Sequence, residues 1–394
     1  ILNRGVSHLI FPDEVPKREL TDTPSAGIPE GRLPSRNIAP PEDALKAAVE
    51  LLRGARRPVI VVGHGARFQM APVVALAEQL KAPVITTFKG KGLISDRHPL
   101  AGGVLGRSGT PIASWLMNEA DCLLVFGASF SNHTGITPKK PTIQVDFDLM
   151  TLAKFHAIDV PVWGEIGVTA KSLADALPGN STTEDQTADV AARWQIWREE
   201  KRRRTQDDHG KGINAAILLE KLGHAAPSDA IIAVDVGNNT YSFGRYFECD
   251  RHAVLMSGYL GSIGFSFPAA MGAWAATQED DPRFNGRQVI SISGDGGLGQ
   301  YLAEINTAVK YGMNITHVLM NNGELGKISK EQRAGNWEVW QTSLHNPEFA
   351  AYAGLCGAMG IRVSEVGELD TAIEQALSHT GPALVEVMTD PELV

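Results

Sequence analysis

Residues 288–326 read QVISISGDGGLGQYLAEINTAVKYGMNITHVLMNNGELG, and this stretch decides the fold. Its two mainly apolar runs, 289–292 and 315–320, predict buried strands, and the apolar spacing between them predicts an amphipathic helix. In a parallel strand–helix–strand unit both strand ends emerge at the same edge of the sheet. We therefore expect Asp295 and Asn322, which follow the two strands, to converge at that edge.

The residue types at this edge indicate the kind of ligand that it binds. Four glycines between 294 and 299 let backbone N–H groups approach an anion at a helix N-terminus, and Asp295 and Asn322 offer oxygen donors. This combination predicts magnesium beside a phosphate group. The alternative is an ordinary doubly wound sheet in which the glycines only make tight turns and Asp295 caps a helix.

The run Gly294-Asp295-Gly296, followed after a gap by Asn321-Asn322, resembles the thiamine diphosphate signature of the pyruvate oxidase and acetolactate synthase superfamily. The resemblance extends over the whole chain. It implies the cofactors thiamine diphosphate and Mg²⁺. It also implies a metal site formed by Asp295, the Asn322 side chain and the Glu324 backbone carbonyl.

Two further loops complete the predicted cofactor site. Residues 235–240 read DVGNNT and open a helix, which suits phosphate binding and equally an N-cap, and the resemblance favours diphosphate contact. Residues 258–264 hold three glycines around Ile263, which by the resemblance keeps thiamine bent, while Gly261 offers its carbonyl to the cofactor's 4'-amino group. The predicted cofactor contacts are Gly237, Asn238, Asn239, Gly261, Ser262, Ile263, Asp295, Gly296, Gly297, Asn322, Glu324, Leu325 and Gly326.

The helix expected after the signature carries the predicted catalytic residues. Ile328 and Glu331 lie one turn apart and face the same way. By the resemblance, the pyruvate oxidase type has an Ile and a Glu here in the reaction pocket, whereas acetolactate synthases typically have a Trp in place of Glu331. Lys327 departs from the aromatic residue of the oxidases, and an exposed Glu paired with a lysine is the alternative interpretation. Ile263, Ile328 and Glu331 form the predicted catalytic set, with Glu331 handling protons.

Length and composition predict two α/β domains. The 394 residues include 43% apolar residues and 40 glycines, and alternating helical and strand patterns predict doubly wound parallel sheets. We place a central α/β domain at 41–178, a charged linker at 179–210 and the thiamine diphosphate domain at 211–394. The proline-rich residues 1–40 resemble an extended connector that follows an amino-terminal pyrimidine-binding domain. We expect that domain to be missing and this chain alone to be inactive.

In the resembled family the central domain binds FAD in some members and is empty in others. The candidate residues here are the loop 63–67, the strand end 127–129, and Asp146 and Asp148 after a strand. The alternative is that the glycines only turn the chain and that Asp146 caps a turn. FAD therefore stays an open alternative.

Composition excludes several other classes of protein. A net charge of −9 with dispersed Lys and Arg argues against a nucleic-acid partner. Three scattered cysteines without CxxC spacing give neither a disulfide framework nor a zinc site. No apolar run is long enough to span a membrane and no signal-peptide pattern opens the chain, so a cytoplasmic protein is expected.

The resemblance implies decarboxylation of a small 2-oxo acid, with pyruvate as the first candidate, followed by oxidation of the enamine intermediate. One alternative is acetolactate synthase-like ligation of two 2-oxo acids. Another is a non-catalytic fragment or binding module. We also expect the intact protein to be a homo-oligomer, either a dimer or a tetramer.

Overall fold

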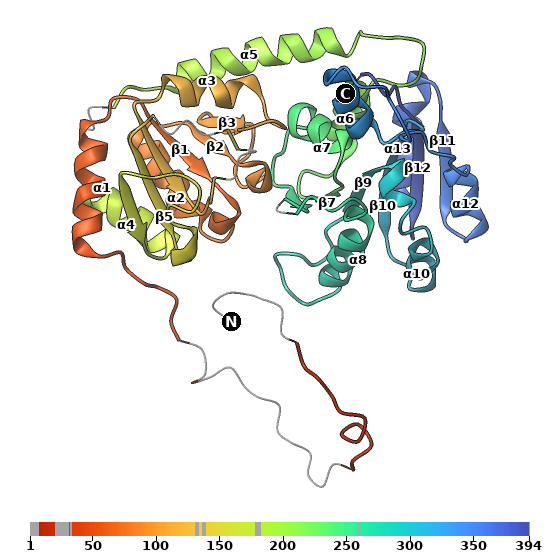
Figure 1. The fold of residues 1–394 in the computed structure, drawn as a ribbon, viewed down its shortest axis with the longest axis horizontal. Coiled ribbons are helices and arrows are strands. Elements are labelled where there is room, and N and C mark those ends of the chain that lie inside the picture. The colour runs from red at the N-terminus through yellow and green to blue at the C-terminus, as the bar shows by residue number, and fades with distance from the viewer. Residues whose placement is uncertain are drawn as a thin grey trace.

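The computed structural model describes residues 8–19, 31, 34–130, 134–135, 139–177, 183–258 and 260–393. Within these residues lie two six-stranded sheets whose neighbouring strands all pair in parallel. Helices flank both sheets (Figure 1). The predicted fold class, two doubly wound α/β domains, is confirmed.

The first sheet domain has the strand order β3-β2-β1-β4-β5-β6. The order reverses between β1 and β4, and ligands of doubly wound sheets bind outside the carboxyl ends of the strands at such a point. Its elements are α1 (Glu42–Gly54), β1 (Pro58–Val62), η1 (His64–Ala66), α2 (Met70–Leu80), β2 (Val84–Thr86), η2 (Phe88–Gly90), β3 (Ala101–Val104), α3 (Pro111–Glu119), β4 (Cys122–Phe126), β5 (Thr142–Asp146), η3 (Leu149–Thr151), β6 (Val160–Trp163) and α4 (Ile166–Ala176).

The second sheet domain has the strand order β11-β12-β10-β9-β7-β8, and its order reverses between β7 and β9. The loops after β7 and β9 therefore flank its expected binding crevice. Its elements are α6 (Ala215–Ala225), β7 (Ile231–Val234), α7 (Asn238–Tyr246), β8 (Ala253–Met256), α8 (Ser266–Thr277), β9 (Val289–Gly294), α9 (Asp295–Leu298), α10 (Glu304–Lys310), β10 (Ile315–Asn321), α11 (Gly326–Ala334), α12 (Phe349–Leu355), β11 (Met359–Val363), η4 (Val366–Glu368), α13 (Leu369–Ser378) and β12 (Ala383–Met388).

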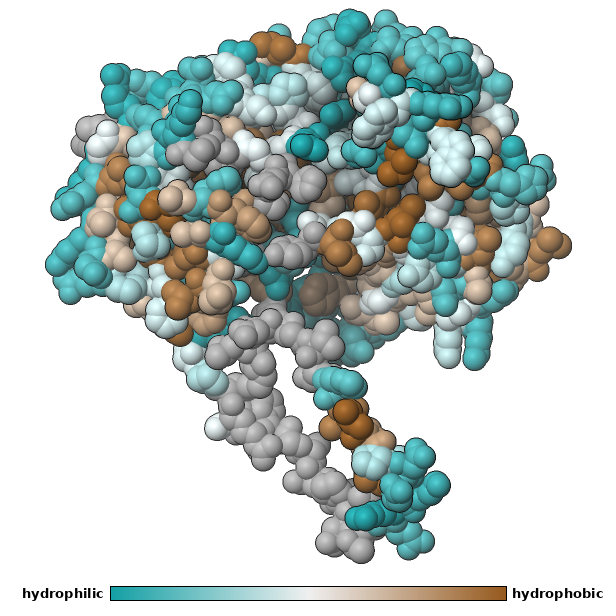
Figure 2. Space-filling model, viewed as in Figure 1, coloured by the Kyte–Doolittle hydropathy of each residue, from teal (hydrophilic) through white to brown (hydrophobic). Residues whose placement is uncertain are grey.

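One long helix, α5 (Thr187–Arg204), lies over the first sheet domain and ends near the second (Figure 1). Its outer surface carries mostly hydrophilic side chains, at the top of the view in Figure 2. On the inner side, Trp194 donates its indole N–H to the carbonyl of Ala101 in β3 (2.6 Å), and buried Trp197 stacks on Tyr246 of α7 with ring centroids 6.2 Å apart. Both tryptophans dock the helix, and they join one buried apolar cluster that includes residues of both domains.

Three short strands show little strand pattern of their own in the sequence. They are β3, β6 and β8, each of four residues. In β3, Gly102 and Gly103 lower the strand propensity, and in β6 Pro161 interrupts the pattern. The strand conformation of these short elements depends on pairing with the neighbouring strand more than on the local sequence.

The segments outside the two domains are only partly described. Residues 8–19 lie away from both domains and are exposed, with turns as their only local structure (Figure 1). The rest of the predicted connector up to residue 33, apart from residue 31, lies outside the described residues, as do residue 178 of the predicted central domain and residues 179–182 of the predicted linker. Among the described residues, none of the helices combines the length and the apolar character needed to cross a membrane.

Candidate active site

The ends of β9 and β10 bring the two signature residues together. The strands are neighbours in parallel register, with Met320 beside Gly294. Asp295 accepts a hydrogen bond at Oδ2 from the backbone N–H of Gly323 (2.8 Å), and Asp295 and Asn322 line one cavity of about 340 Å³. The predicted convergence is confirmed, and it lies at the crevice beside β9.

Asp295 is buried and held from three sides. Its Oδ1 accepts the backbone N–H of Gly296 (3.0 Å), and its Oδ2 also accepts the side-chain amide of Asn346 (2.7 Å). Burial raises the pKa of Asp295, while the hydrogen bonds from Asn346, Gly296 and Gly323 act in the opposite direction. Sequence reasoning missed Asn346, which lies on the loop between α11 and α12 and has no motif around it.

The cavity wall contains nearly all of the predicted cofactor contacts. They are Gly237, Asn238, Asn239, Gly261, Ile263, Asp295, Gly296, Gly297, Asn322, Glu324, Leu325 and Gly326. Ser262 is the exception, and its backbone N–H donates to Ser257 Oγ (3.1 Å). Among the predicted catalytic residues, Ile328 and Ile263 line this cavity, whereas Glu331 does not.

The loop that carries Ile263 is held by Asp235, at the end of β7. The Asp235 carboxylate accepts the backbone N–H of Gly264 (2.8 Å) and of Phe265 (3.2 Å). Burial raises the pKa of Asp235, and these backbone hydrogen bonds act against that rise. The N-cap of α7 is Gly237, without a side-chain cap, so Asp235 anchors the loop instead of capping the helix.

The cavity fits a diphosphate group because a donor and open space meet there. The side-chain nitrogen of Asn238 is buried and has no hydrogen-bond partner among the described residues. A Cβ at Gly326 would lie 2.8 Å from that nitrogen, and a Cβ at Gly296 would lie 2.7 Å from Leu325 Cδ2, so a larger residue at either position would push these side chains aside. Asn238 also opens α7, whose N-terminal N–H groups favour anions.

The donor set also fits magnesium, which binds few protein oxygens and keeps water and phosphate ligands. Asp295 supplies a carboxylate and Asn322 an amide oxygen. The Glu324 carbonyl accepts the N–H of Gly326 (2.9 Å) and has a second lone pair, while its carboxylate accepts Ser329 Oγ (2.8 Å). In the part of the chain that is described, no cluster of three or more His, Cys, Asp or Glu side chains is suited to a metal.

The start of α11 carries an ion pair at the rim of the cavity. Lys327 Nζ pairs with the carboxylate of Glu331, and the hydrogen bond from Lys327 holds the pKa of Glu331 below its usual value. The Glu331 side chain is 58% exposed. This arrangement is the exposed Glu–Lys pair that was the alternative interpretation of the motif. Of Ile328 and Glu331, Ile328 lines the cavity and Glu331 does not.

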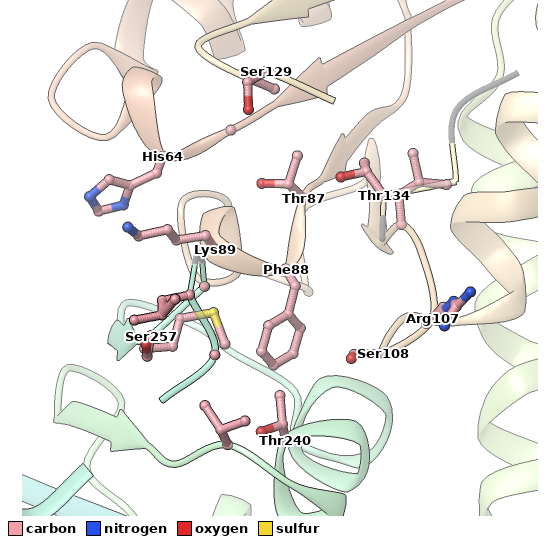
Figure 3. Close-up of a pocket in the computed structure, with 18 of the residues that line it drawn as sticks. His64, Thr87, Phe88, Lys89, Arg107, Ser108, Ser129, Thr134, Thr240 and Ser257 are labelled. Carbon is pink, nitrogen blue, oxygen red and sulfur yellow. The ribbon is translucent and has the colours of Figure 1, made fainter. Parts of the chain in front are cut away.

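A second cavity, of about 410 Å³, lies between the two sheet domains (Figure 3). Both predicted flavin loops reach it, through Gly63 and His64 after β1 and through residues 127–129 after β4, whereas Asp146 does not line it. Burial, followed by the charges of Arg67 and Lys89, lowers the pKa of His64 to about 4, so its ring is neutral near pH 7.

The two cavities share part of their walls. Val236, Gly237, Gly261 and Lys327 line both. The described wall of the interdomain cavity carries Lys89, Arg107 and Lys327 and no Asp or Glu. An anionic ligand there would lie directly beside the cavity at Asp295.

Comparison with known proteins identifies the class. Residues 45–173 match the thiamine pyrophosphate enzyme central domain, and residues 235–387 match the C-terminal TPP binding domain of these enzymes. Thiamine pyrophosphate is another name for thiamine diphosphate. The chain therefore contains the central and C-terminal domains of the thiamine pyrophosphate enzyme family.

Individual relatives agree with this family. The chain is 29% identical over 389 residues to YdaP of Bacillus subtilis (strain 168), which is named as thiamine pyrophosphate-containing, with 98% of this chain and 65% of the relative covered. It is 30% identical over 359 residues to the acetolactate synthase large subunit of Parasynechococcus marenigrum, with 88% of this chain and 57% of the relative covered. It is 28% identical over 361 residues to the acetolactate synthase isozyme 2 large subunit of Escherichia coli (strain K12), with 89% of this chain and 63% of the relative covered. The chain thus spans between 57% and 65% of the length of these relatives.

Proposed function

We propose that this chain binds thiamine diphosphate and Mg²⁺ at Asp295 and acts in the decarboxylation of a 2-oxo acid, with pyruvate as substrate and oxidation as the outcome. The observation that carries the proposal is the single cavity in which buried Asp295, Asn322 and the unpartnered amide of Asn238 meet. These groups are suited to a metal ion and to the diphosphate that it neutralises.

Each residue of the cavity has a distinct part in this function. When bound, thiamine diphosphate supplies a nucleophilic carbon and accepts the electrons released with carbon dioxide. Asp295, Asn322 and the Glu324 carbonyl hold Mg²⁺, and Asn238 and the first turn of α7 hold the diphosphate. Ile263, fixed through Asp235, shapes the space for the rings, and Ile328 gives the substrate side an apolar surface that limits access of water.

The interdomain cavity supports the oxidative form of the reaction. Its cationic wall suits an anionic ligand, and the loops after β1 and β4 at the crevice of the first sheet domain suit a nucleotide. We propose FAD as that ligand, with its diphosphate near Lys89 or Arg107. The FAD proposal is tested by mixing FAD with the purified chain, separating free FAD by gel filtration and measuring the flavin absorbance of the protein fraction.

The second candidate function is ligation of two 2-oxo acids. It is favoured by the names of the relatives, which include acetolactate synthase large subunits. Lys327 and Arg107 would then attract the carboxylate of the second substrate. Both functions share the same cofactor site, so product analysis separates them and cofactor binding does not.

Calorimetric titration of thiamine diphosphate with Mg²⁺ into wild type and Asp295→Ala tests the shared site. Removing one partner of a buried charged contact costs about 3 to 5 kcal/mol, so we expect at least about a 100-fold loss of affinity. Asp175→Ala, which removes an exposed carboxylate paired with Lys171, is the control. Equal affinities of wild type and Asp295→Ala would refute the site. With the intact protein, pyruvate and a dye acceptor, dye reduction supports oxidation, whereas acetolactate formed without dye reduction supports ligation.

A further inference from the structure

A buried carboxylate on β12 is linked to the metal site, although it lies outside the cavity. Glu386 is fully buried, and its Oε1 accepts the side-chain amide of Asn321 (2.7 Å). Its Oε2 accepts the backbone N–H of Ala350 (3.0 Å). The nearest cation is Arg362, whose Nη1 lies 3.9 Å from Oε1. Both oxygens of Glu386 therefore act as hydrogen-bond acceptors.

The link continues from Asn321 to the predicted metal ligand. Asn321 Oδ1 accepts the side-chain amide of Asn346 (3.0 Å). The same Asn346 nitrogen donates to Asp295 Oδ2 (2.7 Å). Four side chains from β12, β10, the α11–α12 loop and the start of α9 thus form one chain of hydrogen bonds that ends on the Asp295 carboxylate.

The carboxylate of Glu386 fixes which groups donate and which accept along this chain of hydrogen bonds. Because Glu386 only accepts, the NH₂ group of Asn321 must face it, and the Asn321 oxygen must face Asn346. The NH₂ group of Asn346 then has two acceptors in front of it, Asn321 Oδ1 and Asp295 Oδ2. A neutral amide in place of Glu386 would not impose this order, since its NH₂ group can face Asn321.

We propose that Glu386 is a positioning residue for the magnesium site, which it controls through Asn321 and Asn346. By holding the Asn346 amide on Asp295 Oδ2, it fixes the rotation of the Asp295 carboxylate and directs the remaining lone pairs toward the metal. The inference rests on the proposed cofactor site and goes beyond it, because Glu386 touches neither metal nor cofactor. Outer partners of this kind typically change metal affinity by about 10- to 100-fold.

The substitution Glu386→Gln reverses the chain of hydrogen bonds. The N–H of Ala350 is a fixed donor, so the Gln oxygen must face it and the Gln NH₂ must face Asn321. Asn321 then turns its oxygen to residue 386 and its NH₂ toward the Asn346 NH₂, which leaves Asp295 without its amide donor. Adding Asn321→Asp restores an acceptor on both sides of position 321, so the double variant recovers the original order.

The test measures the Mg²⁺ concentration that gives half-maximal binding of thiamine diphosphate, by calorimetry on the full chain. We expect this concentration to rise about 10- to 100-fold in Glu386→Gln and to return close to the wild-type value in Glu386→Gln/Asn321→Asp. Thr316→Val is the matched control, because it removes a buried hydrogen bond from a side chain of β10 to the carbonyl of Ala376 in α13 (3.1 Å). It should bind as wild type does.

Two comparisons decide the outcome. Unchanged Mg²⁺ dependence in Glu386→Gln, or no recovery in the double variant, overturns the positioning role. Absence of binding by the wild type overturns the proposed function and this inference together.

A second variant is used if Glu386→Gln does not fold, as judged by circular dichroism. Asn346→Leu, on the partly exposed loop, should also raise the Mg²⁺ requirement. Wild-type Mg²⁺ dependence of Asn346→Leu overturns the positioning role.

Discussion

Asp235 and Gly264 are 29 residues apart in sequence and are joined by a hydrogen bond of 2.8 Å from the Gly264 N–H to Asp235 Oδ1. Gly264 has a φ of 86°, which L side chains rarely adopt, so the loop turns sharply at this point. Ile263, the residue before it, faces the cofactor cavity. The position of Ile263 therefore depends on the carboxylate that follows β7.

Asp235→Asn should weaken thiamine diphosphate binding and destabilise the fold. The groups facing the carboxylate, the N–H groups of Gly264 and Phe265 and the hydroxyl of Ser266, are donors, so an amide NH₂ would leave one buried group unsatisfied at a cost of about 1 to 3 kcal/mol. Urea unfolding and calorimetric titration measure both effects. Ser266→Ala removes only the longest of these contacts (3.5 Å) and should change little. Wild-type binding by Asp235→Asn would show that the loop is held in another way.

Gly326→Ala should abolish cofactor binding while the chain still folds. The added methyl would lie 2.8 Å from Asn238 Nδ2 and 3.0 Å from Asn322 Nδ2, at the point where the diphosphate and metal donors meet. Gly272→Ala is the control, since no atom lies within 4 Å of a Cβ there. Fluorescence titration with thiamine diphosphate and Mg²⁺ measures the loss. Binding that survives in Gly326→Ala would place the diphosphate elsewhere.

Asp146 should make the stability of the chain depend on pH. Burial raises its pKa from 3.8 to about 6, so between these values the folded state binds more protons than the unfolded state. The free energy of unfolding contributed by Asp146 therefore falls by about 3 kcal/mol as pH rises from about 4 to about 6, and it is constant above pH 6.

Asp146→Asn removes this titration, so its stability relative to wild type should rise across that pH window. Urea unfolding at several pH values measures the difference. Asp146→Ala should show the same pH dependence with lower stability throughout, because it also loses the acceptor for the N–H of Asp148 (2.8 Å). Parallel pH profiles of wild type and Asp146→Asn would contradict the raised pKa.

The purified chain should self-associate through the surface around α11. Trp337 is 70% exposed and Trp340 is 68% exposed, and Leu260 is also exposed. Exposed aromatic groups of this size favour burial against another surface. Sedimentation velocity of Trp337→Ser/Trp340→Ser should show a shift toward monomer. Trp163→Ser, on the edge strand β6, is the control, and a shift of equal size there would mean that the association is not specific to this surface.

The sequence was informative where local patterns determine structure. The helix Met70–Leu80 and the strands Cys122–Phe126 and Ile231–Val234 begin and end where their apolar spacing and flanking residues indicate. The meeting of Asp295 and Asn322 also followed from parallel topology. Asn346 and Glu386 could not be found in this way. Their contacts depend on the register of β12 against β10 and on the path of a long loop, which tertiary packing determines.

The helix α5 has a mechanical consequence for the crevice between the two sheet domains. Trp194 is bonded to β3, Trp197 stacks on α7, and the apolar cluster around them includes residues of both domains. Hinge rotation of one domain against the other would have to expose this cluster to water. The two domains should accordingly melt together in one calorimetric transition, and the width of the crevice should be set by side-chain movement and not by domain opening.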